Sequence, residues 1–444
     1  MAFEAGGCNL IGRSHSIGLK ALMIGAIVLG LLIPLALLKS VITERTQLRE
    51  TAYTKVAQGW GGGLTIGGPM LVVPVERSVS VDGRIRRVRN ELYLLPSQLD
   101  IDIQLKLDPE PRYVGIYKVP VYLSTIDIRG EFAAAAPKPL LDNEEATYLW
   151  EQSSLRLPLS QVRSLREVRL AQFAGQTLKL APAAPGVYRG VDSAVDLTGM
   201  TNGQAASFHF QTVIAGSRDF NIMPVGSETE VTLQSDWPHP SFQGAFLPVE
   251  RSISDDGFQA RWQVLELNRS YPQAWLGSDM NEPMLEESAF GVGLYQAVDI
   301  YQRGERAIKY AVLFIALTFL TFFAWEQVSR LRIHPLQYLL IGLALSVFYL
   351  LLIALSEHIA FLWAYLVAAI ALVTLIGVYV AGALRSRSRG TVAAGAMAAV
   401  YGLLYVLVLS EDYALLLGAI TVFVGLAAVM LVTRKIDWYG EQQA

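Results

Sequence analysis

Cysteine is nearly absent from this chain of 444 residues, which has only Cys8. A single cysteine excludes an internal disulfide, so each folded domain must be stabilised by packing alone. Cys8 also precedes the first apolar segment, whereas a lipoprotein cysteine follows one. We therefore interpret Cys8 as an ordinary residue of a short tail.

Charged residues are scarce as well, at 17% of the chain, against about 25% in soluble domains. Hydrophobic residues make up 52%, and the mean hydropathy is +0.37. This shift predicts that much of the chain lies in a lipid bilayer. The net charge of −3 provides no field that would attract nucleic acid, so we expect no such partner.

Long apolar runs are abundant, and a helix needs about 20 apolar residues to cross a bilayer core. The first run, 21–38, lies between Lys20 and Lys39 and contains Pro34, which membrane helices tolerate. A cleaved signal peptide is the alternative, but no small-residue cleavage pattern follows, which favours an uncleaved anchor. Five more runs occupy 311–325, 336–355, 359–380, 391–409 and 413–432.

Basic residues occur at both chain ends and in alternate short connections between these runs. They are Arg13 and Lys20, then Arg330 and Arg332, then Arg385, Arg387 and Arg389, and finally Arg434 and Lys435. The breaks at 356–358 and 410–412 contain no Lys or Arg. Because basic loops stay in the cytoplasm, this pattern predicts six transmembrane helices with both termini cytoplasmic.

The same pattern predicts five parts along the chain. We expect a cytoplasmic tail at 1–20, transmembrane helix 1 at 21–42, an extracytoplasmic β-rich domain with an N-terminal helical stalk at 43–306, a five-helix transmembrane bundle at 307–434 and a cytoplasmic tail at 435–444. The fold class is thus an α+β membrane protein, with the β-rich domain inserted between helices 1 and 2.

Strand patterns dominate the inserted region, which has apolar and polar residues in alternation and a hairpin turn at Asp82-Gly83. We predict strands within 70–75, 84–95, 99–107, 119–132, 177–180, 207–214, 229–233, 258–265 and 290–298. The region is large enough for a sandwich, or for two β subdomains divided near residue 190. Its core candidates are the aromatic residues Trp237, Phe242, Phe246, Phe258 and Trp262.

Three segments of this region invite a functional interpretation. The loop at 58–63 (QGWGGG) lacks the Gly-Lys-Ser/Thr sequence of a phosphate site, so we interpret it as a joint. Arginines 84, 86, 87 and 89 could meet anionic lipid or polysaccharide, although such charges usually protect a strand edge. In 237–242 (WPHPSF), two prolines exclude a central strand, so Trp237 and His239 belong to an edge or rigid turn. No HExxH or CxxC pattern supports a metal there.

The outer ends of the membrane helices carry Glu357 and His358, and also Glu411 and Asp412. Together they could form an acidic ring with one histidine that binds a cation or docks the external domain. The alternative is ordinary helix capping and loop solvation. These four residues, with Trp237 and His239, are the candidate interaction residues.

Ionisable residues are absent from the middles of the six apolar runs. Ion-coupled transporters and proton pumps usually keep such residues within the bundle, so a secondary transporter is disfavoured. No nucleophile elbow or zinc motif is visible either. We therefore expect no catalytic residues, no cofactor and no metal.

Several segments resemble the CreD family of bacterial inner membrane proteins. They include 331–340 (LRIHPLQYLL), 348–352 (FYLLL), 355–358 (LSEH), 411–418 (EDYALLLG), 433–439 (TRKIDWY), 237–242 (WPHPSF) and 246–248 (FLP). The resemblance covers nearly the full length. The chain departs from the family at 161–164 (QVRS), where an Asp-x-Arg-Gly stretch is common, and in its extra glycines at 58–63.

The resemblance implies a Gram-negative inner membrane protein of the CreBC two-component regulon. It also implies a role in tolerance to a nuclease colicin and in envelope integrity under β-lactam stress. Our first hypothesis is a non-enzymatic protein whose periplasmic domain binds an envelope protein or polymer while the bundle anchors it in the bilayer. The second is membrane transport or lipid handling through the bundle, and the third is a hydrolase with a site built from scattered residues.

Overall fold

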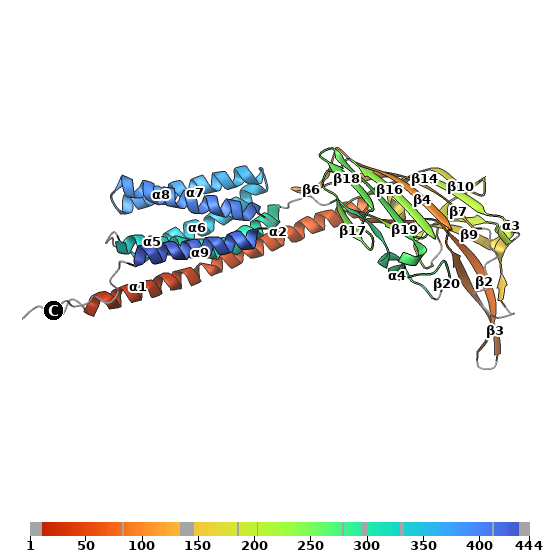
Figure 1. The fold of residues 1–444 in the computed structure, drawn as a ribbon, viewed down its shortest axis with the longest axis horizontal. Helices are drawn as coiled ribbons and strands as arrows, with labels where there is room; N and C mark the ends of the chain where they lie inside the picture. The colour runs from red at the N-terminus through yellow and green to blue at the C-terminus, as the bar shows by residue number, and fades with distance from the viewer. Residues whose placement is uncertain are drawn as a thin grey trace, which may run out of the picture. The chain divides into compact units, whose positions relative to one another are not determined.

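The structure is a computed structural model, which describes residues 11–81, 84–133, 146–183, 186–201, 203–277, 279–294, 300–328, 333–410 and 413–434. The chain forms two compact units, one made of Met1–Leu48 with Val298–Ala444 and the other of Arg49–Ala297. The first unit is helical and the second is dominated by strands, which confirms the α+β class (Figure 1).

The helical unit contains long apolar helices. They are α1 Ile11–Gly30, the first part of α2 Leu32–Gly59, α5 Ile300–Val328, α6 Pro335–Ser356, α7 Phe361–Ala383, α8 Arg387–Leu409 and α9 Ala414–Thr433. Among the described residues, five segments are long and apolar enough to cross a membrane: Leu22–Gly59, Ile300–Phe323, Pro335–Ser356, Phe361–Ala383 and Arg387–Leu409. Helix α9 contributes a shorter apolar stretch, Leu416–Ala427.

Helices α1 and α2 are separated only by Leu31, and Pro34 explains the break. Proline has no N–H to donate to the carbonyl of Gly30, and its ring crowds that carbonyl. The segment predicted at 21–42 is therefore part of a longer helical stretch, which begins at Ile11 and ends at Gly59. The polar residues 43–58 lie within α2, as their lack of glycine and proline predicts.

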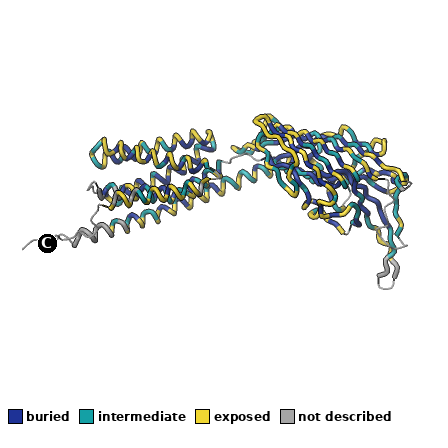
Figure 2. The backbone as a smooth tube through the Cα atoms, viewed as in Figure 1, coloured by how far each residue is buried: buried dark blue, intermediate teal, exposed yellow. Residues whose placement is uncertain are grey.

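Helix α5 lies at the centre of the helical unit, where it contacts α1, α6, α8 and α9. Small residues bring α7 and α8 close together, since a Cβ on Gly390 would lie 2.7 Å from the carbonyl oxygen of Gly377. Close approach at small residues is typical of helix pairs in lipid. Large apolar side chains such as Val378 and Phe423 remain exposed, as expected for lipid-facing surfaces. Exposed positions recur along the helices of this unit (Figure 2).

The β-rich unit contains two large sheets and two small ones. The strand orders are β11-β10-β14-β7-β4-β16-β19-β18, then β12-β13-β9-β2-β3-β20 with β8 beside β2, then β1-β15-β21-β17, and finally β5-β6. Their bounds are β1 Leu64–Gly67, β2 Met70–Val81, β3 Arg84–Leu94, β4 Gln98–Leu107, β5 Arg112–Val114, β6 Tyr117–Val119, β7 Tyr122–Phe132, β8 Ala146–Tyr148, β9 Ser153–Pro158, β10 Leu165–Phe173, β11 Gln176–Thr177, β12 Ala181–Pro182, β13 Gly190–Val195, β14 Ala206–Gly216, β15 Asp219–Met223, β16 Glu228–Ser235, β17 Ser241–Gly244, β18 Glu250–Ser254, β19 Gly257–Leu265, β20 Ala274–Leu276 and β21 Phe290–Gly293. Short helices are α3 Thr198–Thr201, α4 Glu282–Glu287, η1 Trp150–Gln152, η2 Val162–Ser164 and η3 Glu266–Asn268.

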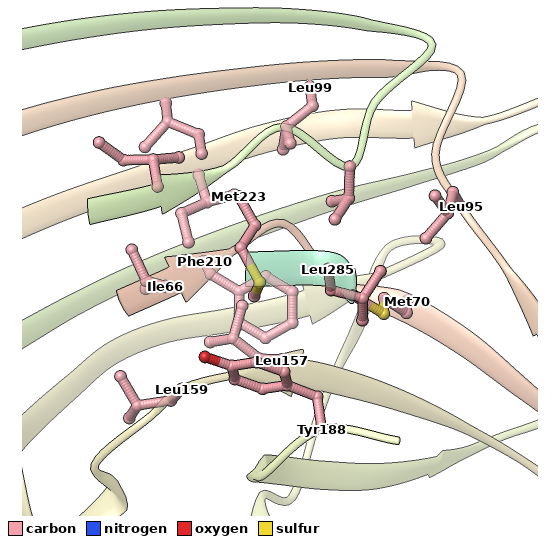
Figure 3. Packing of buried hydrophobic residues seen from close by; sticks show 14 of the residues in the cluster. Ile66, Met70, Leu95, Leu99, Leu157, Leu159, Tyr188, Phe210, Met223 and Leu285 are labelled. Atoms are coloured by element: carbon pink, nitrogen blue, oxygen red, sulfur yellow. The ribbon is translucent and has the colours of Figure 1, made fainter. Parts of the chain in front are cut away.

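One hydrophobic core joins the sheets of this unit. It includes Met70 and Leu157 from the seven-stranded sheet, Phe210 from the eight-stranded sheet and Met223 from the four-stranded sheet (Figure 3). Along β4 and β19 buried and exposed residues alternate, so the eight-stranded sheet buries one face and exposes the other. This arrangement is sandwich-like, and the alternative of two subdomains divided near residue 190 is wrong because strands from both sides of that position pair.

The aromatic prediction is confirmed in part. Phe258 and Trp262 are buried, whereas Trp237, Phe242 and Phe246 pack against the core while remaining partly exposed. The strand predicted at 177–180 is wrong beyond Thr177. There the chain leaves β11, although the Leu178 N–H still donates to the Ala171 carbonyl of β10 at 2.8 Å, and it joins the other large sheet at Ala181.

Candidate functional site

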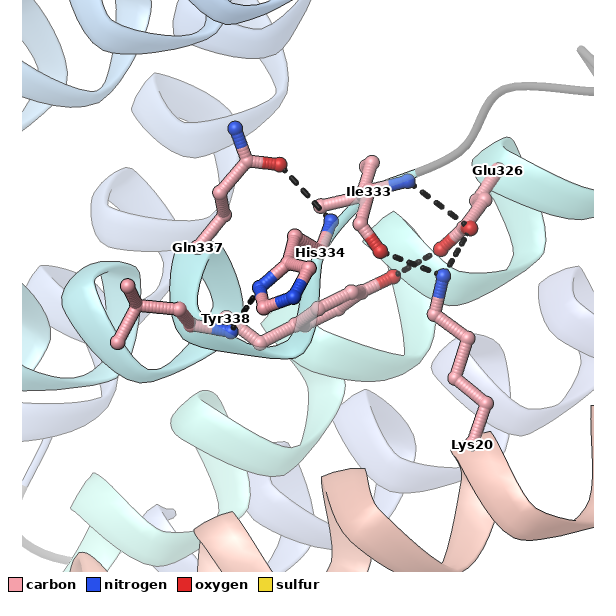
Figure 4. Close-up of polar contacts among 7 residues, drawn as sticks. Lys20, Glu326, Ile333, His334, Gln337 and Tyr338 are labelled. Carbon is pink, nitrogen blue, oxygen red and sulfur yellow. Dashed lines mark hydrogen bonds and ion pairs between the residues drawn. The ribbon is translucent and has the colours of Figure 1, made fainter.

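Lys20 and Glu326 form an ion pair between α1 and α5 (Figure 4). Glu326 is 3% exposed, and its carboxylate also accepts hydrogen bonds from the Tyr338 hydroxyl at 2.9 Å and the Ile333 N–H at 3.1 Å. Lys20 donates to the Ile333 carbonyl at 2.6 Å. We call this group the Lys20–Glu326 clamp, since it joins α1, α5 and the start of α6.

Local sequence places the members of this clamp. Helix α5 continues past the apolar run, to Val328, and so holds Glu326 in its last turn. Helix α6 begins with a capping box, in which the His334 ring nitrogen accepts from Leu336 and the Gln337 side chain accepts from the His334 N–H. Pro335 at the first helical position completes this start, which the sequence predicts from His334-Pro335.

A second clamp involves Glu357, which follows α6. Its carboxylate lies 3.6 Å from the Arg45 guanidinium of α2 and accepts a hydrogen bond at 3.1 Å from Tyr301, near the start of α5. Its side chain is 10% exposed. The Arg45–Glu357 clamp therefore joins α2 to the start of α5 and the end of α6. The Lys20–Glu326 clamp joins α1 to the opposite ends of the same two helices, α5 and α6.

The two clamps bracket the first apolar run. Lys20 and Arg45 are 25 positions apart in the chain, which corresponds to about 38 Å of helix at a rise of about 1.5 Å per residue, and a bilayer core is about 30 Å thick. Both pairs thus match the edges of an apolar layer. Glu326 and Arg45 are not among the candidate residues predicted from the sequence. The predicted apolar run ends at Trp325, and the acidic residue directly after it, Glu326, was the signal that could have revealed the first pair.

The structure gives a different result for each residue of the predicted acidic ring. Glu357 points to Arg45 and Tyr301, so its carboxylate already has a cation and a donor. His358 is exposed beside it. Glu411 and Asp412 lie outside the described residues. The Glu357 carboxylate is therefore a structural tie between α2, α5 and α6.

Trp237 and His239 form a closed turn. The Trp237 indole donates to the His239 carbonyl oxygen at 2.8 Å, and the Trp237 N–H donates to Ser235 at 3.2 Å. The His239 side chain is exposed. Among the described residues, no group of three or more His, Cys, Asp or Glu side chains is arranged to hold a metal.

The two segments that depart from the family pattern, 58–63 and 161–164, contact each other. The Gln161 side chain accepts from the Gly62 N–H at 3.0 Å and donates to the Gly63 carbonyl at 3.3 Å. Gly61 has a φ of 142°, and a Cβ there would lie 2.5 Å from the Ala215 carbonyl oxygen. The glycine loop is thus a packed joint whose Gly62 N–H is occupied, not a phosphate cradle.

A buried polar network crosses the seven-stranded sheet. Arg156 of β9 is 1% exposed and donates twice to the Asp192 carboxylate of β13, both times at 2.8 Å. It also donates to the Tyr93 hydroxyl at 3.3 Å, and that hydroxyl donates to Glu91 at 2.6 Å. Burial, together with the Glu91 hydrogen bond, raises the pKa of Tyr93 to about 12. The network keeps a buried arginine fully paired.

Glu91 and Tyr93 also line a groove of about 730 Å³ at the edge of this sheet. We call it the edge groove. Its other walls are the neighbouring part of β2 and β3, the segment before β13 and the start of α4, including Pro74, Arg89, Asn90, Gly186, Val187 and Glu282. Its described lining combines charged groups, Arg89, Glu91 and Glu282, with apolar ones, a composition that suits binding.

A second polar groove, of about 400 Å³, lies on the exposed face of the eight-stranded sheet. Its centre is Asp127 of β7, which contacts Arg129 at 2.8 Å, Gln211 at 2.6 Å and His209 at 3.1 Å. Burial alone would raise the pKa of Asp127, but these hydrogen bonds outweigh it and the pKa falls below its ordinary value. Asp100, on β4, has a raised pKa because of burial and the neighbouring carboxylates.

Long apolar helices with paired charges, together with a separate β-rich unit, define a multi-pass membrane protein. A family model described as "Inner membrane protein CreD" matches residues 16–439. The inner membrane protein CreD of Escherichia coli strain K12 is 33% identical over 430 residues, covering 94% of this chain and 92% of that relative. The chain belongs to the CreD family of inner membrane proteins.

The Lys20–Glu326 clamp is testable by a double-mutant cycle. Lys20→Met leaves Glu326 as a buried, uncompensated charge, so we expect it to destabilise the helical unit by about 3–5 kcal/mol. Lys20→Met with Glu326→Gln should cost less than the sum of the single changes. Thermal unfolding in detergent, followed by circular dichroism, measures this, with the exposed Lys39→Met as control. Additive effects would show that the pair is not coupled.

Asp127 makes stability depend on pH. Because its folded pKa is depressed, its contribution is present above the ordinary aspartate pKa of about 3.9 and disappears as pH falls through the lower folded value. Asp127→Asn should therefore destabilise the β-rich unit at pH 7 and have a smaller effect near pH 3. Urea unfolding at both pH values is the measurement. Asp102→Asn, on the same sheet face, is the control, and a difference that is equal at both pH values contradicts this role for Asp127.

Proposed function

We propose that this protein is a non-enzymatic envelope protein of the inner membrane. In this proposal six helices cross the membrane, both termini are cytoplasmic, and the β-rich unit lies in the periplasm. That unit binds an envelope protein or polymer, and the helices hold it at the membrane. The family resemblance adds a role in envelope integrity and stress tolerance under two-component control.

One contrast between the units carries this proposal. In the helical unit, the carboxylates at the ends of α5 and α6, Glu326 and Glu357, are each paired with a basic residue of the first helical stretch, in the Lys20–Glu326 and Arg45–Glu357 clamps. In the β-rich unit, by contrast, two polar grooves of about 730 and 400 Å³ open at the surface. An open groove gives a partner access to the polar groups that line it, whereas a buried ion pair between helices gives no such access.

Lipid handling through the helices is the second candidate. An apolar pocket of about 130 Å³ lies between α5 and α8, lined by residues that include Phe322, Trp325 and Met397. Such a pocket suits an acyl chain. We favour the first proposal because this pocket is small and its few polar lining groups, Thr318 and Thr321, bond to carbonyls of their own helix.

The proposed topology predicts where a reporter is active. Alkaline phosphatase, which matures only in the periplasm, should be active when fused near residue 200 and inactive when fused after residue 434. The reason is that basic connections are retained in the cytoplasm. Green fluorescent protein fused at the same positions should give the reverse pattern. Phosphatase activity at the C-terminus, or its absence near residue 200, would contradict the topology.

Partner binding predicts adducts in living cells. A photo-crosslinking residue placed at Gln104, on the exposed sheet face, at Val88, on β3, or at His239 should capture an envelope protein or polymer, identified by mass spectrometry. The same residue at Phe423, exposed on α9, controls for lipid and random contacts. If no position in the β-rich unit yields an adduct, while the purified protein moves a lipid or ion across vesicles, the second candidate replaces the first.

A further inference from the structure

Strand β3 has a free edge along part of its length. On one side it pairs with β2 without a register shift, from Arg84 to Leu94. On the other side β20 pairs with it only at Leu92–Leu94. Among the described residues, no strand pairs with that side of β3 from Arg86 to Asn90. The open stretch is thus about five residues long, as long as a typical strand.

The backbone direction along this edge follows from two hydrogen bonds. The Gly277 N–H donates to the Glu91 carbonyl at 2.7 Å, and the Leu95 N–H donates to the Gln273 carbonyl at 2.9 Å. Odd-numbered residues of β3 therefore direct their backbone groups toward β20. Because the register is continuous, the N–H groups of Arg87 and Arg89 point the same way, beyond the end of β20.

The side chains along the free edge are basic. Arg86, Arg87 and Arg89 are all exposed. Glu76 lies opposite Arg89 on β2, Glu91 accepts the Tyr93 hydroxyl, and the Arg89 guanidinium donates to the Gln152 side chain at 3.3 Å. Arginines on an edge repel a second copy of the same edge, which prevents self-association, but they attract an acidic chain.

The edge groove begins where β20 turns away. After Gly277 the chain leaves the sheet for α4, and the groove of about 730 Å³ lies between these segments and β3. Its floor includes Tyr93, which is held by Arg156 and by the Val187 N–H at 3.2 Å. An extended chain that pairs with Arg87 and Arg89 would therefore place one end in a preformed groove.

We propose that the free edge of β3 binds an acidic peptide segment of a partner protein by β-strand addition. The backbone N–H groups of Arg87 and Arg89 pair with the peptide backbone, the exposed arginines bind its carboxylates, and the edge groove receives a side chain at one end. This mode gains affinity from main-chain hydrogen bonds and specificity from pockets and charge. The inference rests on the proposed function and names its partner class.

An anionic polysaccharide is the competing ligand, and backbone pairing separates the two. A polysaccharide would use the arginines alone, whereas strand addition also requires N–H groups on the peptide. The probe is an array of eight-residue peptides with Glu at alternate positions and varied residues between them. Binding to the full-length protein in detergent is measured by fluorescence anisotropy, with dextran sulfate as the polysaccharide probe.

We expect peptides from this array to bind and to crosslink to a photoreactive residue at Val88. Some peptides are N-methylated at every second residue, so that they lose the backbone N–H groups that face β3. These peptides should bind about tenfold or more weakly, because about two hydrogen bonds are lost. The double variant Arg87→Glu/Arg89→Glu should weaken it at least as much. The matched control Arg163→Glu/Arg251→Glu changes net charge equally at exposed sites on other strands and loops and should change affinity less than about twofold.

Other results would overturn the inference. If no peptide binds more tightly to the wild type than to the Arg87→Glu/Arg89→Glu variant, the edge is not a peptide site. A second contrary result is that N-methylation at either set of alternate peptide residues leaves peptide affinity unchanged, while Arg87→Glu/Arg89→Glu weakens dextran sulfate binding as much as peptide binding. In that case the site recognises anionic polymers without strand pairing. Adducts in cells from Gln104 or His239, but none from Val88, would refute this edge while leaving the proposed function intact.

Discussion

Every polar group that enters an apolar layer must find its partner within the chain, and this constraint organises the helical unit. Water is not available there to solvate a charge or a backbone carbonyl. Lys20 and Glu326 satisfy each other, and the remaining carboxylate and ammonium positions are filled by Tyr338 and by the backbone of Ile333. Charges therefore join α1, α5 and α6 rather than standing open to an ion.

The same constraint explains the position of the second clamp. Arg45 and Glu357 stand about one bilayer thickness from the first pair, so each pair lies near one end of the apolar run 21–38. The Pro34 break removes one backbone hydrogen bond between the clamps, yet the helix resumes directly after Leu31. A long helix held by ion pairs near both edges of an apolar layer tolerates such a defect.

The β-rich unit, by contrast, must be stable without a disulfide. It does so with one core shared by several sheets and with a buried arginine whose donors are bound by Asp192 and Tyr93. The glycine loop and Gln161, the two departures from the family pattern, compensate each other: the loop approaches the Gln161 segment closely because it lacks side chains, and Gln161 binds its backbone. A rigid scaffold of this kind can present an open strand edge without losing its own pairing.

The sequence by itself determined the α+β class, the apolar helices, the turn at 237–239 and most long strands, because hydrophobic period and proline position are local signals. It also identified the family. The shared core, the strand order and the pairing of Lys20 with Glu326, 306 positions along the chain, were decided only by tertiary structure. So was the free edge of β3: arginines 86, 87 and 89 are visible in the sequence, but where β20 ends is not. Long-range partners depend on how the whole chain folds, and no local pattern encodes them.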